Sequence, residues 1–250
     1  MIEVTIIGTG ALARNLYHTF LESDQIHLQI IGRSKEALQY FTKSSTSTDF
    51  KKAKKSDVIL LAVSDSAVEE CEAAVGKHKS VIAHCAGSLS LTSLTSENAG
   101  VFYPLQTYNT KSFVNFKCVP ILIEAKNKKT CEVLKKLANI LSIDVREIDS
   151  NKRKEAHLAA VFANNFSNYL FGISKELLSD FELPDDLLNE LILQTAKNAV
   201  AFDPKSIQSG PARRNDFKTI EQHLNMIKDP NHKNRYEQLS NAIKDQYNEL

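Results

Sequence analysis

A glycine-rich turn stands near the start of the chain, between an apolar run and a helical pattern. Its sequence, Gly8-Thr9-Gly10-Ala11-Leu12-Ala13, has the spacing GxGxxA. In a dinucleotide site the first glycine permits a tight turn, the second lets the backbone approach a pyrophosphate, and the small last residue lets the helix pack on the strand. The helix N-terminus also offers free N–H groups to phosphates. The alternative is a tight turn that binds no ligand. The residues predicted to contact the cofactor here are Gly8, Thr9, Gly10, Ala11 and Leu12.

The end of the second apolar run indicates which dinucleotide is bound. A site for NAD has an acidic residue there, which accepts a hydrogen bond from the ribose 2′-OH. This run ends instead in Gly32-Arg33-Ser34. A guanidinium and a hydroxyl suit a 2′-phosphate, so the sequence predicts NADP bound by Arg33 and Ser34. The alternative is that Arg33 is a solvated loop charge.

A third buried run ends in Val63-Ser64-Asp65. Ligands of open α/β sheets bind at the carboxyl ends of the strands, so Val63, Ser64 and Asp65 are predicted to lie beside the cofactor. Asp65 or Ser66 can also cap the helix that follows, and the two roles are compatible.

Other polar residues stand where a substrate could bind. His84 ends a strand on the crevice side, or is a core histidine with satisfied nitrogens; Cys85 has no evident activating base. Gln106 and Tyr108 follow Pro104 on a predicted crevice loop. Arg213 and Arg214 could bind a substrate carboxylate or phosphate, and a site role is favoured for Arg214 and Asp216. The alternative is that Asp216 caps the next helix while the arginines bind water or neighbouring acidic residues. The predicted substrate contacts are His84, Gln106, Asn164, Arg214 and Asp216.

Short apolar runs that alternate with amphipathic helices must position these residues. This pattern is typical of a parallel sheet covered on both faces, so we predict a doubly wound α/β domain with a mostly parallel sheet. The expected strands are Glu3–Ile7, Ile26–Ile31, Asp57–Val63, Ser80–His84, Gly100–Tyr103, Val119–Glu124 and Ile143–Ile148. The expected helices are Ala11–Ser23, Lys35–Lys43, Ser66–Lys77 and Lys128–Leu141; Ser44–Thr48 is expected to be a loop.

After Ser150 the strand pattern stops, and the remainder is predicted to be helical. We expect a Rossmann-type nucleotide-binding domain over residues 1–150 and a helical substrate and dimerisation domain over 151–250. The expected helices are Lys152–Asp180, Asp185–Phe202, Phe217–Ile227 and His232–Tyr247. The first of them is apolar on several faces, so we expect it to be buried. Because a short helical domain can hardly cover such a helix within one chain, we expect the protein to form a symmetric homodimer.

Composition excludes several classes of protein. With 31 basic and 30 acidic residues the formal charge is +1, which argues against a nucleic-acid binder. The longest strongly apolar run, Val58–Val63, is far too short for a membrane helix, and the N-terminal residues do not resemble a secretory signal, so we expect a cytoplasmic protein. The four cysteines are expected to be free thiols, and no histidine or cysteine spacing predicts a metal site.

The motifs together resemble a known family. Gly8–Ala13, Gly32-Arg33-Ser34 and Leu61–Asp65 are similar to the NADP-binding half of the pyrroline-5-carboxylate reductase and β-hydroxyacid dehydrogenase superfamily. The segments His84–Ser88, Phe102–Thr107 and Ser209–Asp216 resemble Rossmann-like oxidoreductases with a helical C-terminal domain of unknown function, over essentially the whole chain. The resemblance implies a Rossmann fold and NADP.

The resemblance also indicates where a proton donor would lie. In β-hydroxyacid dehydrogenases a helix carries a catalytic lysine followed by an asparagine; matching Asn164-Asn165 to that pattern puts Val161 at the lysine position. His157 lies one turn earlier, and His157, Asn164 and Asn168 share a narrow arc of an ideal helix. We predict that His157 and Asn165 are catalytic, the alternative being a structural histidine.

Two functions remain open at this point. The favoured one is an NADP-dependent oxidoreductase that transfers hydride between nicotinamide and a small carbonyl, imine or hydroxy acid. The other is a noncatalytic NADP-binding sensor or regulator. A homologue that binds no nucleotide would require an occluded glycine loop.

Overall fold

The computed structural model describes residues 1–248, with the backbone alone for Lys54 and Asn248. The chain divides into two compact units, the first ending at Asn164 and the second beginning at Asn165.

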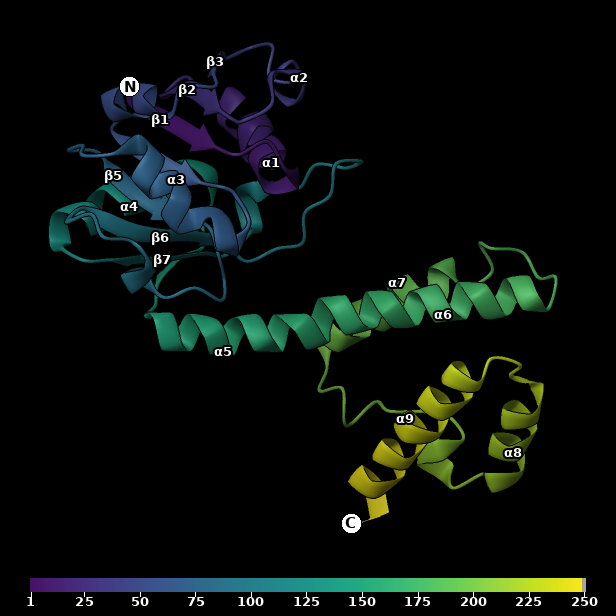
Figure 1. Ribbon diagram of the computed structural model, residues 1–250. Coiled ribbons are helices and arrows are strands. Elements are labelled where there is room, and N and C mark those ends of the chain that lie inside the picture. Colours follow the sequence, from purple (N-terminus) through teal and green to yellow (C-terminus); the bar gives the residue numbers. More distant parts are fainter. Residues whose placement is uncertain (249–250) are drawn as a thin grey trace. The chain divides into compact units, whose positions relative to one another are not determined.

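The first unit is built on a mostly parallel sheet (Figure 1), as predicted. Its strands are β1 (Ile2–Ile7), β2 (Ile26–Ile31), β3 (Ser45–Ser47), β4 (Val58–Leu61), β5 (Val81–His84), β6 (Ala99–Pro104), β7 (Ile121–Ala125) and β8 (Val145–Glu147). They lie in the order β3-β2-β1-β4-β5-β6-β7-β8. The β6–β7 pair is antiparallel, and the other described pairs are parallel. Parallel pairing brings the carboxyl ends of β1, β2, β4, β5 and β6 to one edge, where the predicted site residues lie.

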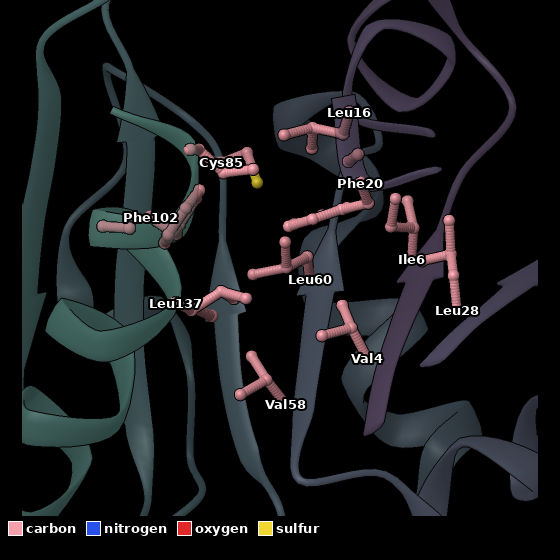
Figure 2. Packing of buried hydrophobic residues seen from close by; sticks show 14 of the residues in the cluster. Val4, Ile6, Leu16, Phe20, Leu28, Val58, Leu60, Cys85, Phe102 and Leu137 are labelled. Carbon is pink, nitrogen blue, oxygen red and sulfur yellow. The ribbon is translucent and has the colours of Figure 1, made fainter. Parts of the chain in front are cut away.

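Helices cover both faces of this sheet because its strands are apolar on both sides. The helices of the first unit are α1 (Ala11–Leu21), α2 (Lys35–Leu38), α3 (Val68–Val75), α4 (Lys128–Leu141) and α5 (Ser150–Ala160). One core joins alternate strand residues to α1 and α4, as Figure 2 shows for Ile6, Leu60, Phe20 and Leu137. The other core joins the intervening residues to α3. Burial of each such large apolar side chain stabilises the folded sheet by about 1.5–3 kcal/mol, so the sheet is a stable platform for the residues at its edge.

Three details of the first unit differ from the sequence expectations. The segment expected to be a loop contains β3, which pairs with Gln29–Ile31 at the edge of the sheet. This strand is short and polar, as edge strands often are, so it carries no apolar signal. Helix α2 ends at Leu38 rather than Lys43, and the helix expected from Ser66 begins as a 3-10 turn at Asp65–Ala67 that precedes α3.

The second unit contains helices α6 (Ser167–Asp180), α7 (Asn189–Ala201), α8 (Phe217–Met226) and α9 (Pro230–Asn248) (Figure 1). Between α5 and α6 the backbone is π-helical over Val161–Phe166. The wider turn breaks the 3.6-residue period, so the single polar arc predicted for His157, Asn164 and Asn168 does not apply. The expected burial of this long helix is also wrong for the single chain, since Leu158 and Phe162 are 62% and 63% exposed. No described helix has the length and apolarity to cross a membrane.

Candidate functional site

The glycine turn lies at the centre of the sheet edge, between the ends of β1, β2 and β4. Gly8 has φ +135°, and a Cβ added there would lie 2.2 Å from the carbonyl oxygen of Ala62. The Gly8 N–H donates to Ile31 O at 2.9 Å. Gly10, in contrast, has no heavy atom within 4 Å of an added Cβ. The first glycine is thus required by the fold, and the second leaves open space in front of the N-terminus of α1.

A cavity of about 470 Å³ opens in front of this turn. This volume falls in the range of small-molecule sites in proteins. The glycine loop is therefore accessible and not occluded. The lining includes nine of the ten residues predicted to bind the cofactor: Gly8, Thr9, Gly10, Ala11, Leu12, Arg33, Ser34, Val63 and Ser64.

Arg33 is the one basic side chain that lines this cavity in the described part of the chain. Its Nη2 lies 3.7 Å from Oε2 of Glu70, and the two side chains are 63% and 70% exposed. An exposed pair of this length contributes little free energy, so a phosphate can displace Glu70. Ser34 caps α2 by accepting from Ala37 N at 3.1 Å, and its hydroxyl donates to Glu36 at 2.7 Å. Ser34 would have to redirect that proton to bind a phosphate.

Asp65 does not line the cavity, but it connects the cavity to a second group of polar residues. The residue before it, Ser64, lines the cavity, while the Asp65 carboxylate accepts a hydrogen bond from the Ser88 hydroxyl. Ser88 follows Gly87 in the loop after β5. The loops after β4 and β5 are therefore joined at the carboxyl edge of the sheet.

Tyr103 and His157 form a hydrogen-bonded pair beside that loop. The phenol oxygen of Tyr103, from β6, lies 3.0 Å from Nδ1 of His157, on α5. A Cβ on Gly87 would lie 2.7 Å from His157 Nδ1 and 2.8 Å from Tyr103 Cζ. The loop backbone therefore passes directly against the pair. Tyr103 is a site residue that the sequence reasoning missed, although it stands in the segment that carries the family resemblance.

Arg153 holds α5 against the loop and the sheet. Its side chain is fully buried. Nη1 donates to Glu124 Oε2 at 2.5 Å, while Nη2 donates to Leu89 O and, at 3.2 Å, to Ser150 Oγ. Because Leu89 belongs to the loop that contacts His157, this guanidinium fixes the helix and the loop relative to each other. Sequence reasoning missed it, since a single arginine in a charged helix start resembles a solvated residue.

His84 is a structural residue rather than the substrate contact that we predicted. It is fully buried. Its Nε2 lies 3.3 Å from Ser90 O, and its Nδ1 accepts from Ala86 N at 3.2 Å. Both ring nitrogens thus bind the backbone of the loop after β5, and no ring atom is left for a substrate. Burial, followed by the nearby Arg153 charge, lowers the pKa of His84 to about 4.

This low pKa predicts that acid destabilises the protein through His84. The unfolded chain takes up a proton on this ring near pH 6.5, whereas the folded protein does so near pH 4. The contribution of His84 is therefore complete above pH about 6.5 and is lost as the pH falls to about 4, by about 3 kcal/mol. Urea unfolding at several pH values measures this loss. His84→Gln keeps a donor and an acceptor but cannot titrate, so its stability should fall less with acid; an equal fall would contradict the assignment.

The other candidate site residues of the first unit are Cys85, Gln106 and Asn164, and none of them lines the cavity. Cys85 is 7% exposed, and burial raises its pKa to about 12, so it is a neutral thiol at physiological pH and not a nucleophile. Gln106 is exposed, and its side-chain oxygen accepts from Thr107 N at 2.9 Å. Asn164 is exposed in the π-helical segment.

Three of the predicted site residues belong to the second unit: Asn165, Arg214 and Asp216. Asn165 and Arg214 are exposed. Asp216 is the N-cap of α8, where it accepts from Thr219 N at 3.1 Å and from the Thr219 hydroxyl at 2.8 Å, so both of its oxygens serve the cap. No group of three or more histidine, cysteine or acidic side chains able to hold a metal occurs within residues 1–248.

The chain resembles known proteins both in its domains and over its whole length. Residues 3–87 match the family model described as NADP oxidoreductase, coenzyme F420-dependent, and residues 119–243 match a domain of unknown function, DUF2520. None of the curated proteins matches the chain.

Solved structures resemble the chain over nearly its full length. A Bacteroides fragilis protein with the provisional description NADP oxidoreductase is 33% identical, covers 98% of both chains and has a TM-score of 0.90. A pyrroline-5-carboxylate reductase from Coxiella burnetii is 18% identical over 99% of this chain and 98% of its own, with a TM-score of 0.58. An imine reductase from Myxococcus stipitatus, solved with NADP+, is 13% identical over 97% and 92%, with a TM-score of 0.65. The last two show the fold alone. The first, with the domain matches, shows that the chain belongs to the NADP oxidoreductase family in which a Rossmann-type domain precedes the domain DUF2520.

Proposed function

We propose that this protein is an NADP-dependent oxidoreductase that transfers hydride between C4 of nicotinamide and a small carbonyl, imine or hydroxy acid. The observation that carries the proposal is the 470 Å³ cavity, in which the glycine turn, the N-terminus of α1 and Arg33 lie together. Free N–H groups at the helix start suit a pyrophosphate, and the guanidinium suits a 2′-phosphate. The NADP oxidoreductase model that matches residues 3–87 and the relatives solved with NADP support the same cofactor.

In this proposal His157 supplies the proton that accompanies hydride transfer. Imidazole is suited to proton transfer near neutral pH. Its pairing with Tyr103 orients the ring beside the loop that follows β5. Asn165 is proposed as a further catalytic residue. Asn164, Gln106 and the exposed Arg214 are proposed as substrate contacts.

We also propose that the protein acts as a cytoplasmic homodimer. Apolar side chains of α6 and α7 are exposed in the single chain, among them Tyr169, Leu191 and Val200 at 48%, 62% and 91%. Large apolar side chains exposed in this number favour burial against a second copy. The mass of the particle in solution tests this, and a monomer would contradict it.

Titration of the purified protein with NADPH and NADH, followed by fluorescence or calorimetry, tests the cofactor assignment. We expect a preference for NADPH, and Arg33→Ala should reduce it by about 10-fold or more, since hydrogen bonds to a charged group contribute about 1.5–3 kcal/mol. Glu70→Gln is the matched control because it removes the opposite charge of the same ion pair, and it should keep the preference. Absence of binding for both nucleotides would overturn the proposal.

A further inference from the structure

We propose that Tyr103 is a positioning residue that holds His157 with its Nε2–H free to face the substrate. This inference rests on the proposed function, because it concerns the group that supplies the proton there. It adds a residue outside the cofactor cavity and assigns each ring nitrogen of His157 a separate task.

The contact between the two rings is enclosed. The phenol oxygen and Nδ1 are 3.0 Å apart, and the rings meet edge to face at 76° with centroids 6.0 Å apart. Gly87 closes one side, since even a methyl group there would overlap both partners. The ring of His157 therefore has little freedom to turn while the bond to Tyr103 is present.

The direction of the hydrogen bond follows from the chemistry of the two groups. Burial raises the pKa of Tyr103, and although the Arg153 charge opposes this change, the Asp65 charge supports it, so the phenol keeps its proton. Within residues 1–248, the hydrogen-bond partner of the Tyr103 phenol oxygen is Nδ1 of His157. A half-buried donor without an acceptor would cost about 1–3 kcal/mol. In the neutral pair Tyr103 therefore donates to Nδ1, and the ring proton lies on Nε2.

The same contact orients the protonated ring. When the ring is an imidazolium, Nδ1–H donates to the phenol oxygen and Nε2–H again points away from Tyr103. A bound nicotinamide would supply the hydride to a carbonyl carbon, and the imidazolium would release its Nε2 proton to the carbonyl oxygen. The ring is then neutral with its remaining proton on Nδ1, donated to the Tyr103 oxygen, until Nε2 takes a proton from the solvent or the ring relaxes to the Nε2–H tautomer. The products would be one alcohol and one oxidised nicotinamide, with Tyr103 unchanged.

Nitrogen NMR of the full chain labelled with 15N-histidine tests the assignment without a substrate. Long-range 1H–15N spectra in alkaline buffer, where histidine rings are generally neutral, report which ring nitrogen carries the proton. His157→Gln identifies the signals of His157. In the unaltered protein we expect a proton on Nε2 and none on Nδ1. In Tyr103→Phe we expect this single tautomer to be lost and replaced by an exchange-averaged mixture.

The His18–Tyr40 pair provides a matched control, because Nε2 of His18 lies 2.6 Å from the Tyr40 hydroxyl. Tyr40→Phe should alter the signals of His18 and leave those of His157 in place. A proton on Nδ1 in the unaltered protein, or His157 signals that do not respond to Tyr103→Phe, would overturn the inference. NADPH titration of the same samples separates the two proposals: lost tautomer selection with intact NADPH binding supports Tyr103, whereas absent NADPH binding in the unaltered protein contradicts the proposed function alone.

Discussion

Replacement of Arg153 by methionine should reduce the free energy of unfolding by about 3–5 kcal/mol, because it leaves Glu124 as a charge without its partner in a largely buried place. The substitution also removes the donors to Leu89 O and Ser150 Oγ. The loop after β5 then keeps its hydrogen bond from Leu91 N to Ser150 Oγ but loses the contact from Arg153 to α5, so the Tyr103–His157 bond should weaken as well. Urea unfolding followed by circular dichroism measures the first effect, and the histidine spectra described above measure the second.

Two further variants test whether the loss of stability in Arg153→Met comes from the unpaired, largely buried Glu124 carboxylate. Arg153→Met combined with Glu124→Gln removes the uncompensated carboxylate and should recover part of the lost stability. Arg146→Met breaks the Asp144 pair, whose arginine is 66% exposed, and should leave the stability nearly unchanged. A cost for Arg153→Met as small as that for Arg146→Met would show that the buried ion pair has no special importance.

The sequence predicted the first unit well where apolar periodicity and glycine spacing coincide. Gly8 and Gly10 could be placed because few residue types can occupy a turn with positive φ or allow a close backbone approach. Arg33 could be placed because the end of the second strand is fixed by the sheet topology. Nine of the ten predicted cofactor residues then line one cavity.

Residues whose role depends on contacts between distant segments could not be predicted in the same way. The partner of Tyr103 is 54 residues away, and Leu89, which Arg153 binds, is 64 residues away. His84 was misassigned because a strand end indicates position but not the direction of the ring. The π-helical segment was missed because the prediction assumed an ideal helical period. For Tyr103 and Arg153 the deciding interaction is tertiary, and no local pattern encodes it.

Gly8→Ala should abolish NADPH binding and destabilise the first unit by about 2–4 kcal/mol, since it combines backbone strain with overpacking. The added methyl group would lie 2.2 Å from the carbonyl oxygen of Ala62, and φ is +135°, where an L residue is strained. Relief requires the turn to move away from the end of β4. Because the N–H groups at the start of α1 move with it, the cavity loses its phosphate-binding geometry. Unfolding and NADPH titration of the same sample measure both effects.

Gly10→Ala separates the two effects, because it adds the same methyl group two residues later without a clash. No heavy atom lies within 4 Å of the new Cβ, and the backbone of Gly10, at φ −75° and ψ −171°, is one that alanine adopts readily. The variant should therefore fold with nearly unchanged stability. Gly10 lines the cavity, so the methyl group should still hinder the approach of the pyrophosphate and weaken NADPH binding. Full NADPH affinity in a stable Gly10→Ala protein would mean that the cofactor phosphates do not pass over this turn.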